Sequence, residues 1–363
     1  MPRRIIIAGG GTGGHIFPAL AIAHALKRKE PDMEILFIGA SGKMEMQKIP
    51  EAGFDIRGID MAGYNRSSLI KNFSLPYKLI KSFFQVREIF KSFKPQAAIG
   101  VGGYSTYPVL RYAQAMGIPT FIHESNSRAG KSNIMLGKKA NRIFTASDEM
   151  EKYFPVSRLM YTGNPVRKNV VSNRLSRTEG LAFFDLDPQY TTVLVTGGSL
   201  GAKSINEAIN AGVSALTKKH IQLIWQTGKS FSAEAAAHAA ENRMIWTGDF
   251  ISKMEYAYAA ADIVVSRSGS VLYELCAVKK PVIFVPYPYA AEDHQTVNAE
   301  NLVKKQAAIL IPDQDANEKL VNEVIRLAED KAEQEILKEN IAKLAITDAD
   351  EKIANEILKT LNG

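Results

Sequence analysis

The chain has 363 residues, more than one ordinary domain core accommodates, and this length predicts two domains of about 150 to 180 residues each. Its 46% hydrophobic and 23% charged content is typical of a soluble globular protein, and no apolar run is long enough for a signal peptide or a membrane-spanning helix. Cys276 is the single cysteine, which excludes an intrachain disulfide and a cysteine-rich metal site and fits a reducing compartment.

The net charge of +7 is concentrated in one segment. Residues 64–94 contain seven lysines and arginines against one acid, Glu88, so that they carry +6 of the excess. Charges elsewhere nearly cancel. This distribution argues against a broad nucleic-acid surface, and we expect no nucleic-acid partner.

Short apolar stretches alternate with helical ones through the first half of the chain. We predict a helix at residues 18–28 and strands at 4–8, 34–38, 97–101 and 120–123. Continuous apolar strands separated by helices indicate a parallel sheet that is covered on both faces.

The same pattern restarts after Pro188. We predict a helix at residues 204–216 and strands at 191–196, 221–226, 263–266 and 282–285. Residues 335–361 have helical periodicity. We therefore expect an α/β protein with two Rossmann-like domains, residues 1–163 and 164–340. A terminal helix within 341–363 is expected to pack back on the first domain.

Each half opens with a strand that runs into a glycine-rich turn, at residues 9–14 and at residues 197–202. Without a Cβ the backbone can approach a ligand closely, and the helix that follows presents unpaired N–H groups. Such turns suit a pyrophosphate or a sugar with several hydroxyls.

Two common nucleotide motifs fit these turns incompletely. Residues 9–14 satisfy the dinucleotide fingerprint, but an NAD site wants an acid at the end of the second strand, and residues 37–41 contain none. The second turn resembles a phosphate-binding loop of NTPases, yet Ala202 replaces a required glycine. We expect no cofactor.

Asp185-Leu186-Asp187 has the spacing of a metal-binding pair of carboxylates. Pro188 and the strand that follows place the pair on a connecting loop, so we expect no metal there.

Several motifs occur in order along nearly the whole chain. They are Gly-Gly-Thr-Gly-Gly-His-Ile-Phe-Pro at 10–18, Gly-Gly-Tyr at 102–104, His-Glu-Ser-Asn at 123–126, Gly-Asn-Pro-Val-Arg at 163–167, Gly-Gly-Ser-Leu-Gly-Ala at 197–202, Ser-Arg-Ser-Gly at 266–269 with Glu274, and Asp-His-Gln at 293–295 with Asn298. In this respect the chain resembles the MurG family, the bacterial transferases that make the second membrane-bound intermediate of peptidoglycan synthesis. The resemblance implies a GT-B fold, in which two Rossmann-like domains face each other across a cleft.

The resemblance also implies a set of residues that bind the donor UDP-GlcNAc: Thr12, Gly13, Gly14, Asn126, Arg167 at the diphosphate, Ser199 at the phosphate loop, Ile251 at the uracil, Glu274 at the ribose and Gln295 at the GlcNAc hydroxyls. One departure is that residues 268–274 are one residue shorter than the family pattern, with Tyr273 where a small residue is usual. The alternative is a structural role: a tight turn for the glycines, a linker position for Arg167, and solvated helix positions for Glu274 and Gln295.

The reaction implied by the resemblance transfers GlcNAc to the 4-hydroxyl of undecaprenyl-linked MurNAc-pentapeptide with inversion at the anomeric carbon. One displacement of this kind needs a base for the acceptor hydroxyl. His15 is our candidate, because imidazole titrates near neutrality and the residue lies where the first loop meets its helix. A purely structural hydrogen bond from His15 to the loop is the alternative. Glu124 could orient His15, bind acceptor hydroxyls or act as the base, whereas His123 is expected to be a packing residue.

The basic segment predicts binding to an anionic membrane surface, because lysines alternate there with aromatic and aliphatic residues. The candidate membrane residues are Leu69, Ile70, Lys71, Phe73, Leu75, Lys78 and Leu79. An ordinary amphipathic helix is the alternative, and for residues 83–93 it explains the pattern at least as well. We expect a peripheral protein on the cytoplasmic face of the bacterial inner membrane.

Three other functions fit parts of the pattern. A UDP-GlcNAc 2-epimerase binds the same donor on a similar fold but needs neither residues 69–94 nor the motif at 123–126 in this form. Transfer to another glycolipid and a non-catalytic nucleotide-sugar module are the remaining alternatives.

Overall fold

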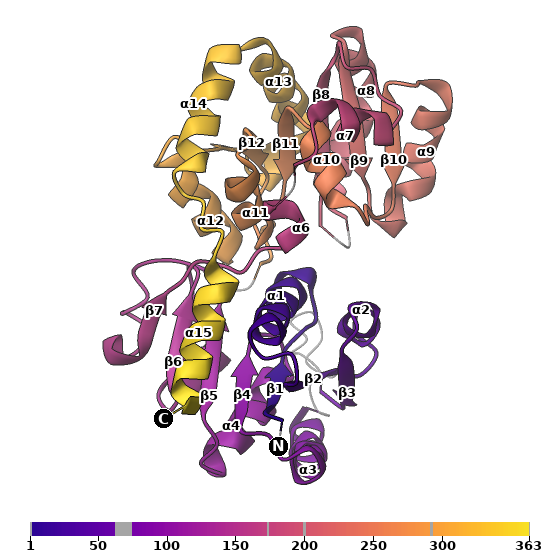
Figure 1. Ribbon diagram of the computed structural model, residues 1–363. Helices are drawn as coiled ribbons and strands as arrows, with labels where there is room; N and C mark the ends of the chain where they lie inside the picture. Colours follow the sequence, from indigo (N-terminus) through magenta and orange to yellow (C-terminus); the bar gives the residue numbers. More distant parts are fainter. Residues whose placement is uncertain (1, 62–74, 173, 199–200, 291–292, 363) are drawn as a thin grey trace. The chain divides into compact units, whose positions relative to one another are not determined.

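The computed structural model describes residues 2–61, 75–172, 174–198, 201–290 and 293–362 (Figure 1). The chain divides into two compact units, Met1–Val166 together with Asp348–Gly363, and Arg167–Thr347. Each unit is built on one parallel sheet.

The sheet of the first unit has seven strands in the order β3-β2-β1-β4-β5-β6-β7, and every neighbouring pair is parallel. The strands are β1 (Arg4–Ala8), β2 (Glu34–Ala40), β3 (Asp55–Ile59), β4 (Ala97–Gly100), β5 (Thr120–Glu124), β6 (Arg142–Thr145) and β7 (Leu159–Tyr161). The helices are α1 (Gly13–Lys29), α2 (Glu45–Glu51), α3 (Leu75–Phe93), α4 (Thr106–Ala115), α5 (Lys131–Gly137) and α15 (Ala349–Asn362).

Continuous apolar strands explain why helices cover both faces of this sheet. Ile5 and Ile7 of β1 point to one face, where they belong to a buried cluster with residues of α1 and α15. Ile6 points to the other face and is buried with residues of α3 and α4. Alternation along a strand sends successive side chains to opposite faces, so a run without polar residues must be covered twice.

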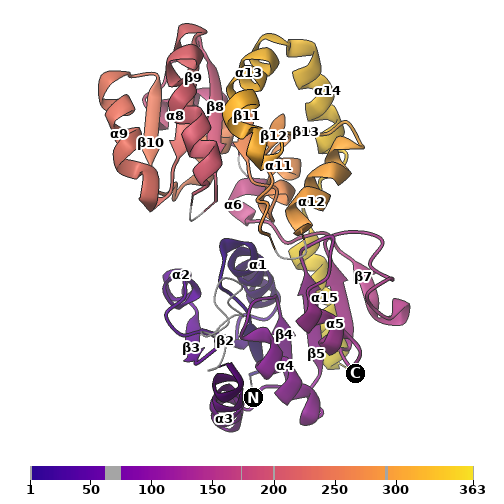
Figure 2. The ribbon, with the colours of Figure 1, turned by 180° about the vertical axis from the view of Figure 1, so that it is seen from behind.

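The second unit repeats this plan with six parallel strands in the order β10-β9-β8-β11-β12-β13 (Figure 2). The strands are β8 (Thr191–Thr196), β9 (Ile221–Gln226), β10 (Ile245–Gly248), β11 (Ile263–Ser266), β12 (Val282–Phe284) and β13 (Ile309–Leu310). The helices are α6 (Lys168–Val171), α7 (Arg177–Phe183), α8 (Lys203–Lys218), α9 (Ser232–Glu241), α10 (Met254–Ala260), α11 (Val271–Val278), α12 (His294–Val303), α13 (Ala316–Glu329) and α14 (Lys331–Ala342).

Two helices differ from the sequence prediction. Helix α1 begins at Gly13 rather than at Pro18, so that Gly13, Gly14 and His15 lie in its first turn and the proline is inside the helix. The helical periodicity of residues 335–361 belongs to two helices, because α14 ends at Ala342 and α15 begins at Ala349.

Helix α15 packs against α1 in the first unit. Ile353, Ala354 and Ile357 are fully buried there, and Arg28 of α1 forms an ion pair with Asp350 at 2.7 Å. The last residues of the chain thus complete the core of the unit that contains its first residues.

Candidate active site

Strand order places both glycine loops at equivalent positions in the two sheets. In the first unit the chain leaves β1 toward β2 on one side, whereas β4 lies on the other side. In the second unit β8 lies between β9 and β11 in the same way. Ligands of open α/β sheets bind where the strand order reverses, beyond the carboxyl ends of the strands. The loop after β1 and the described residues that follow β8 each lie at such a point.

The first loop is held against the end of β4 and leads directly into α1. The N–H of Gly10 donates to the carbonyl of Gly102 at 3.2 Å. Thr12 is the N-cap residue of α1 in an extended conformation, and the first turn of the helix, with Gly13 and Gly14, has no acidic residue. The positive end of the helix dipole is therefore not neutralised by its own first turn.

The imidazole of His15 contacts the loop at residues 9–14 and also Gly102, which follows β4. Its Nδ1 lies 3.0 Å from the carbonyl oxygen of Gly10. Because a carbonyl only accepts, Nδ1 carries the proton, and Nε2 is the basic nitrogen of the neutral ring. The ring lies against Gly102, where an added Cβ would lie 2.7 Å from Nε2, so that this position requires glycine.

A buried carboxylate that the sequence analysis did not identify contacts the same loop. Glu45, 1% exposed, begins α2, and its Oε2 accepts from the N–H of Gly11 at 2.7 Å. Its Oε1 accepts from the N–H of Ala40 at 3.0 Å. Glu45 lies four residues beyond Ser41 and therefore outside residues 37–41, where a dinucleotide site would have its acid.

Glu124, at the end of β5, is surrounded by hydrogen-bond donors. Its carboxylate accepts from the backbone and side-chain N–H groups of Asn126, each at 3.1 Å, from the N–H of Gly130 at 3.0 Å and from the amide of Asn133 at 2.8 Å. A carboxylate has about four acceptor positions. Four donors favour an organising role for Glu124, which holds Asn126 in place, over the role of base.

His123 lies next to it on β5 and is buried. Burial lowers the pKa of His123 to about 3; the charge of His15 adds to this shift, and the backbone of Gly163 opposes it. The ring is therefore neutral near pH 7, as expected for a packing residue.

In the second unit, two predicted site residues bind each other. Arg167, the N-cap residue of α6, donates from Nε and Nη2 to the two carboxylate oxygens of Glu274 on α11, both at 2.6 Å. Tyr258 of α10 donates its hydroxyl to Glu274 Oε2 at 3.0 Å. Burial alone would lower the pKa of Arg167, but Glu274 outweighs it and the pKa is raised. Burial and Glu274 raise the pKa of Tyr258.

These hydrogen bonds leave few acceptor positions on the Glu274 carboxylate for a ligand. Three donors from described residues occupy its carboxylate, which has about four acceptor positions. One further hydroxyl can bind without displacing Arg167 or Tyr258. Arg167, which was expected to bind the diphosphate, thus donates to Glu274, which was expected to bind the ribose.

A buried amide, Gln226 at the end of β9, holds the second glycine loop. Its Nε2 donates to the carbonyl of Gly198 at 3.0 Å and to Thr196 Oγ1 at 3.2 Å, and its Oε1 accepts from the N–H of Ile251 at 2.9 Å. The glycine loop and the segment expected at uracil are thus fixed to one side chain. Ser199 lies outside the described residues.

Gln295 lies in the first turn of α12, beside the loop that follows β11. Its Oε1 accepts from the N–H of Tyr287 at 2.9 Å, and its backbone carbonyl accepts from the hydroxyl of Ser268 at 2.8 Å. The shortened stretch at residues 268–274 leads from the end of β11 into the first turn of α11, which begins at Val271. The structure therefore brings Gln295 to the same edge of the sheet as the glycine loop.

Arg267, at the end of β11, also went unidentified. It is 9% exposed and donates to the carbonyls of Val285 and Pro286 at 2.8 and 3.1 Å and to the carboxylate of Asp313. These contacts join the segments that follow β11 and β12.

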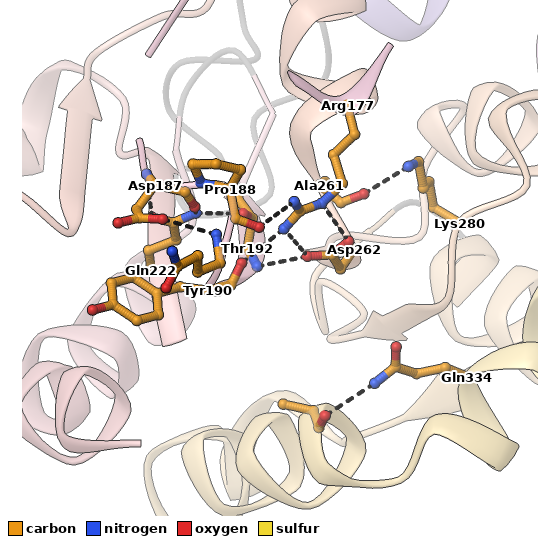
Figure 3. A network of polar contacts seen from close by, with 12 residues as sticks. Arg177, Asp187, Pro188, Tyr190, Thr192, Gln222, Ala261, Asp262, Lys280 and Gln334 are labelled. Carbon is orange, nitrogen blue, oxygen red and sulfur yellow. Dashed lines mark hydrogen bonds and ion pairs between the residues drawn. The ribbon is translucent and has the colours of Figure 1, made fainter. Parts of the chain in front are cut away.

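The pair of aspartates at residues 185–187 lies at the opposite edge of the second sheet, where the strands begin (Figure 3). The Asp187 carboxylate accepts from the N–H of Gln189 at 2.8 Å, and Gln222 of β9 binds the backbone of Asp187 through both atoms of its amide. Within the part of the chain that the structure describes, no group of three or more acidic, histidine or cysteine side chains is placed to hold a metal ion.

Helix α3 contains the described part of the basic segment. Leu75 and Leu79 line a cavity of about 420 Å³ together with Met61, Gly103, Tyr104 and Tyr107. Three large apolar side chains of the helix are exposed, Tyr77, Ile80 and Phe84, and Lys78 is half-buried. Leu69, Ile70, Lys71 and Phe73 lie outside the described residues. Among the helices of the described ranges, none has both the length and the apolar character to cross a bilayer.

Both units match known family domains. Residues 5–145 match the glycosyltransferase family 28 N-terminal domain, and residues 192–357 match the glycosyltransferase family 28 C-terminal domain. A relative from Phocaeicola vulgatus is 49% identical over 348 residues, covering 95% of this chain and 93% of its own length. A relative from Cytophaga hutchinsonii is 46% identical over 345 residues, covering 95% and 93%. Both are named UDP-N-acetylglucosamine–N-acetylmuramyl-(pentapeptide) pyrophosphoryl-undecaprenol N-acetylglucosamine transferase.

Solved structures give the same picture. The crystal structure of Acinetobacter baumannii MurG superposes with a TM-score of 0.75 at 27% identity, covering 99% of this chain and 100% of that one. The UDP-GlcNAc 2-epimerase of Neisseria meningitidis, solved with UDP-GlcNAc bound, has a TM-score of 0.69 at 14% identity, covering 98% and 100%. The second likeness is one of fold alone.

Proposed function

The chain belongs to glycosyltransferase family 28. We propose which of its residues bind the donor, which bind the acceptor and which residue removes the acceptor proton. The chain transfers N-acetylglucosamine from UDP-N-acetylglucosamine to undecaprenyl-pyrophosphoryl-MurNAc-pentapeptide, lipid I, and so makes lipid II for peptidoglycan. The observation that carries this function is the identity of 46% to 49% to transferases named for that reaction, over 95% of this chain.

The second unit binds the donor. Glu274 accepts one ribose hydroxyl at its remaining acceptor position, while Arg167 keeps the carboxylate oriented and contributes positive charge near the departing diphosphate. The loop at residues 197–202 receives the phosphates, with Ser199 as a further contact. The backbone at Ile251 lies at the uracil, and Gln295 reads the GlcNAc hydroxyls. The positions of Gly198, Ile251 and Gln295 beside the carboxyl ends of β8, β9 and β11 support this assignment.

The first unit binds the acceptor and removes its proton. The 4-hydroxyl oxygen attacks the anomeric carbon as the bond from that carbon to UDP breaks, so the configuration inverts and the electron pair leaves with UDP. The hydroxyl proton passes to Nε2 of His15. At the start of α1, Thr12, Gly13 and Gly14 supply further contacts to the donor, and Asn126, held by Glu124, binds donor hydroxyls.

Release of UDP from UDP-GlcNAc, with and without lipid I, tests the function. The transferase releases UDP only when the lipid acceptor is present and forms lipid II in equal amount. A 2-epimerase would convert UDP-GlcNAc into a new UDP-sugar without acceptor, and a binding module would produce neither. Either of these last results contradicts the proposal.

We further propose that α3 binds the cytoplasmic face of the inner membrane, where the acceptor lipid resides. The exposed Tyr77, Ile80 and Phe84 supply apolar area, and Lys78 attracts anionic headgroups at about 1 kcal/mol. Lys81 adds a cation that Asp60 pairs at 2.6 Å. Reversing the charge of Lys71, Lys78 and Lys81 should reduce sedimentation with anionic vesicles. Reversal of the exposed Lys138 and Lys139 is the matched control. Equal sedimentation of both variants would exclude this surface.

A further inference from the structure

The carboxylate of Glu45 is buried without a cation. None of the ion pairs among the described residues includes Glu45, and its two oxygens bind backbone N–H groups instead. An unpaired buried charge is costly, so these N–H groups are the principal compensation that the structure offers. A buried carboxylate without a cation is a candidate for a functional role.

The contacts of Glu45 and His15 meet on a single peptide unit. The N–H of Gly11 donates to Glu45 at 2.7 Å, and the carbonyl of Gly10 accepts from Nδ1 of His15 at 3.0 Å. These two groups belong to the peptide bond between Gly10 and Gly11, and in a trans peptide they point in opposite directions. An anionic acceptor at the N–H end polarises the unit and makes its carbonyl a stronger acceptor.

We propose that Glu45 is a positioning residue for the transfer reaction, acting on His15 through the Gly10–Gly11 peptide. The inference rests on the proposed role of His15 as the base. The relay holds the proton on Nδ1, leaves Nε2 basic, and favours the imidazolium that forms when Nε2 takes the acceptor proton. Glu45 does not contact His15 directly, and the Gly10–Gly11 peptide transmits the effect of its charge.

Two glycines make this contact possible. A Cβ at Gly10 would lie 2.3 Å from Cδ of Glu45, and one at Gly39 would lie 2.5 Å from its Cγ. The carboxylate reaches the peptide only because both positions lack a side chain. A phosphate placed at the Gly11 N–H would also meet the charge of Glu45, so this part of the loop serves proton transfer rather than anion binding.

The test is Glu45→Gln, which keeps the shape of the side chain. An amide offers one acceptor oxygen, so that either the Gly11 or the Ala40 N–H loses its partner. With lipid I and UDP-GlcNAc as substrates, we expect kcat to fall about tenfold while KM for UDP-GlcNAc is unchanged. In a His15→Ala background the same substitution should have no further effect on kcat. Glu51→Gln on the same helix, where Glu51 is exposed and pairs with Lys48, is the matched control.

A spectroscopic measurement tests the contact directly. In ¹⁵N-histidine-labelled protein, His15 should show a protonated Nδ1 and an unprotonated Nε2 when neutral, and Glu45→Gln should give a mixture of tautomers. Normal kcat for Glu45→Gln, an equal loss of kcat in the His15→Ala background, or an Nε2-protonated His15 in the unaltered protein would each overturn the proposal. Absence of acceptor-dependent UDP release by the unaltered protein would instead refute the proposed function and leave the tautomer measurement as the test of the relay.

Discussion

The two glycine loops occupy the same place in their sheets but are held by opposite kinds of side chain. A carboxylate, Glu45, accepts from the first loop, whereas a neutral amide, Gln226, donates to the carbonyl of Gly198 in the second. No carboxylate contacts the described residues of the second loop. A glycine-rich turn alone therefore does not determine which ligand it binds. A negative charge beside the turn suits it to proton transfer, and a neutral support leaves it suited to a diphosphate.

The largest effect should come from His15→Ala, which removes the base from the first loop. We expect kcat to fall by about 10² to 10⁴, as is typical for loss of a general base. The dissociation constant for UDP-GlcNAc, measured by calorimetry, should be unchanged because His15 is not among the residues expected to bind the donor. Near-normal turnover would exclude His15 from this role.

Glu274→Gln breaks the buried pair beside the second loop. We expect the affinity for UDP to fall about 10- to 100-fold, because Arg167 is left without its anion and the ribose without its acceptor. Unaltered protein should prefer UDP to 2′-deoxy-UDP, and the variant should lose that preference in competition titrations. Glu318→Gln, on α13, where Glu318 is exposed, is the control. A preference that survives in Glu274→Gln would contradict ribose recognition by this residue.

Gln226→Glu gives the second loop the kind of charge that the first one has. The new carboxylate cannot donate to the carbonyl of Gly198 and repels a diphosphate, so we expect UDP affinity to fall about tenfold. Gln222→Glu is a matched control, since Gln222 is a buried amide at the other end of β9 with similar backbone contacts (Figure 3). It should lower the melting temperature without changing UDP affinity. Equal loss of affinity in both variants would mean that the effect is only structural.

The last prediction concerns stability rather than catalysis or binding, and the residue is His123. Its pKa is about 3 in the folded chain because of burial, whereas an unfolded histidine titrates near 6.5. Between these values only the unfolded chain binds the proton, so stability falls by about 1.4 kcal/mol for each pH unit as the pH drops from about 6 to 4. His123→Leu should melt with a weaker dependence on pH over this range. Identical pH dependence in both proteins would contradict the neutral buried state.

Much of the fold could be predicted from the sequence because central parallel strands are continuous apolar runs. Residues 4–8 and 191–196 are examples, and both form the predicted strands. Strands β3, β6, β7, β10 and β13 went unpredicted. All but β6 lie at sheet edges and contain half-buried or exposed residues, and β6 is only four residues long. The start of α1 was placed too late because Pro18 is typical of a first helical position, whereas here it lies inside the helix.

The candidate site was predicted only where a residue stands in a recognisable motif. His15, Arg167 and Glu274 do, and the resemblance identified them. Glu45 and Gln226 do not, because an isolated acid or amide acquires its role from the fold, which brings it to a loop 34 residues away in one case and 28 in the other. The pairing of Arg167 with Glu274 likewise depends on a contact across 107 positions that no local pattern encodes.

A crystal structure of the protein with UDP tests the central comparison most directly. We expect the diphosphate on the loop after β8, with the ribose at Glu274 and the uracil at Ile251, and no contact between a phosphate oxygen and the N–H of Gly11. A diphosphate bound on the loop after β1, beside Glu45, would contradict it.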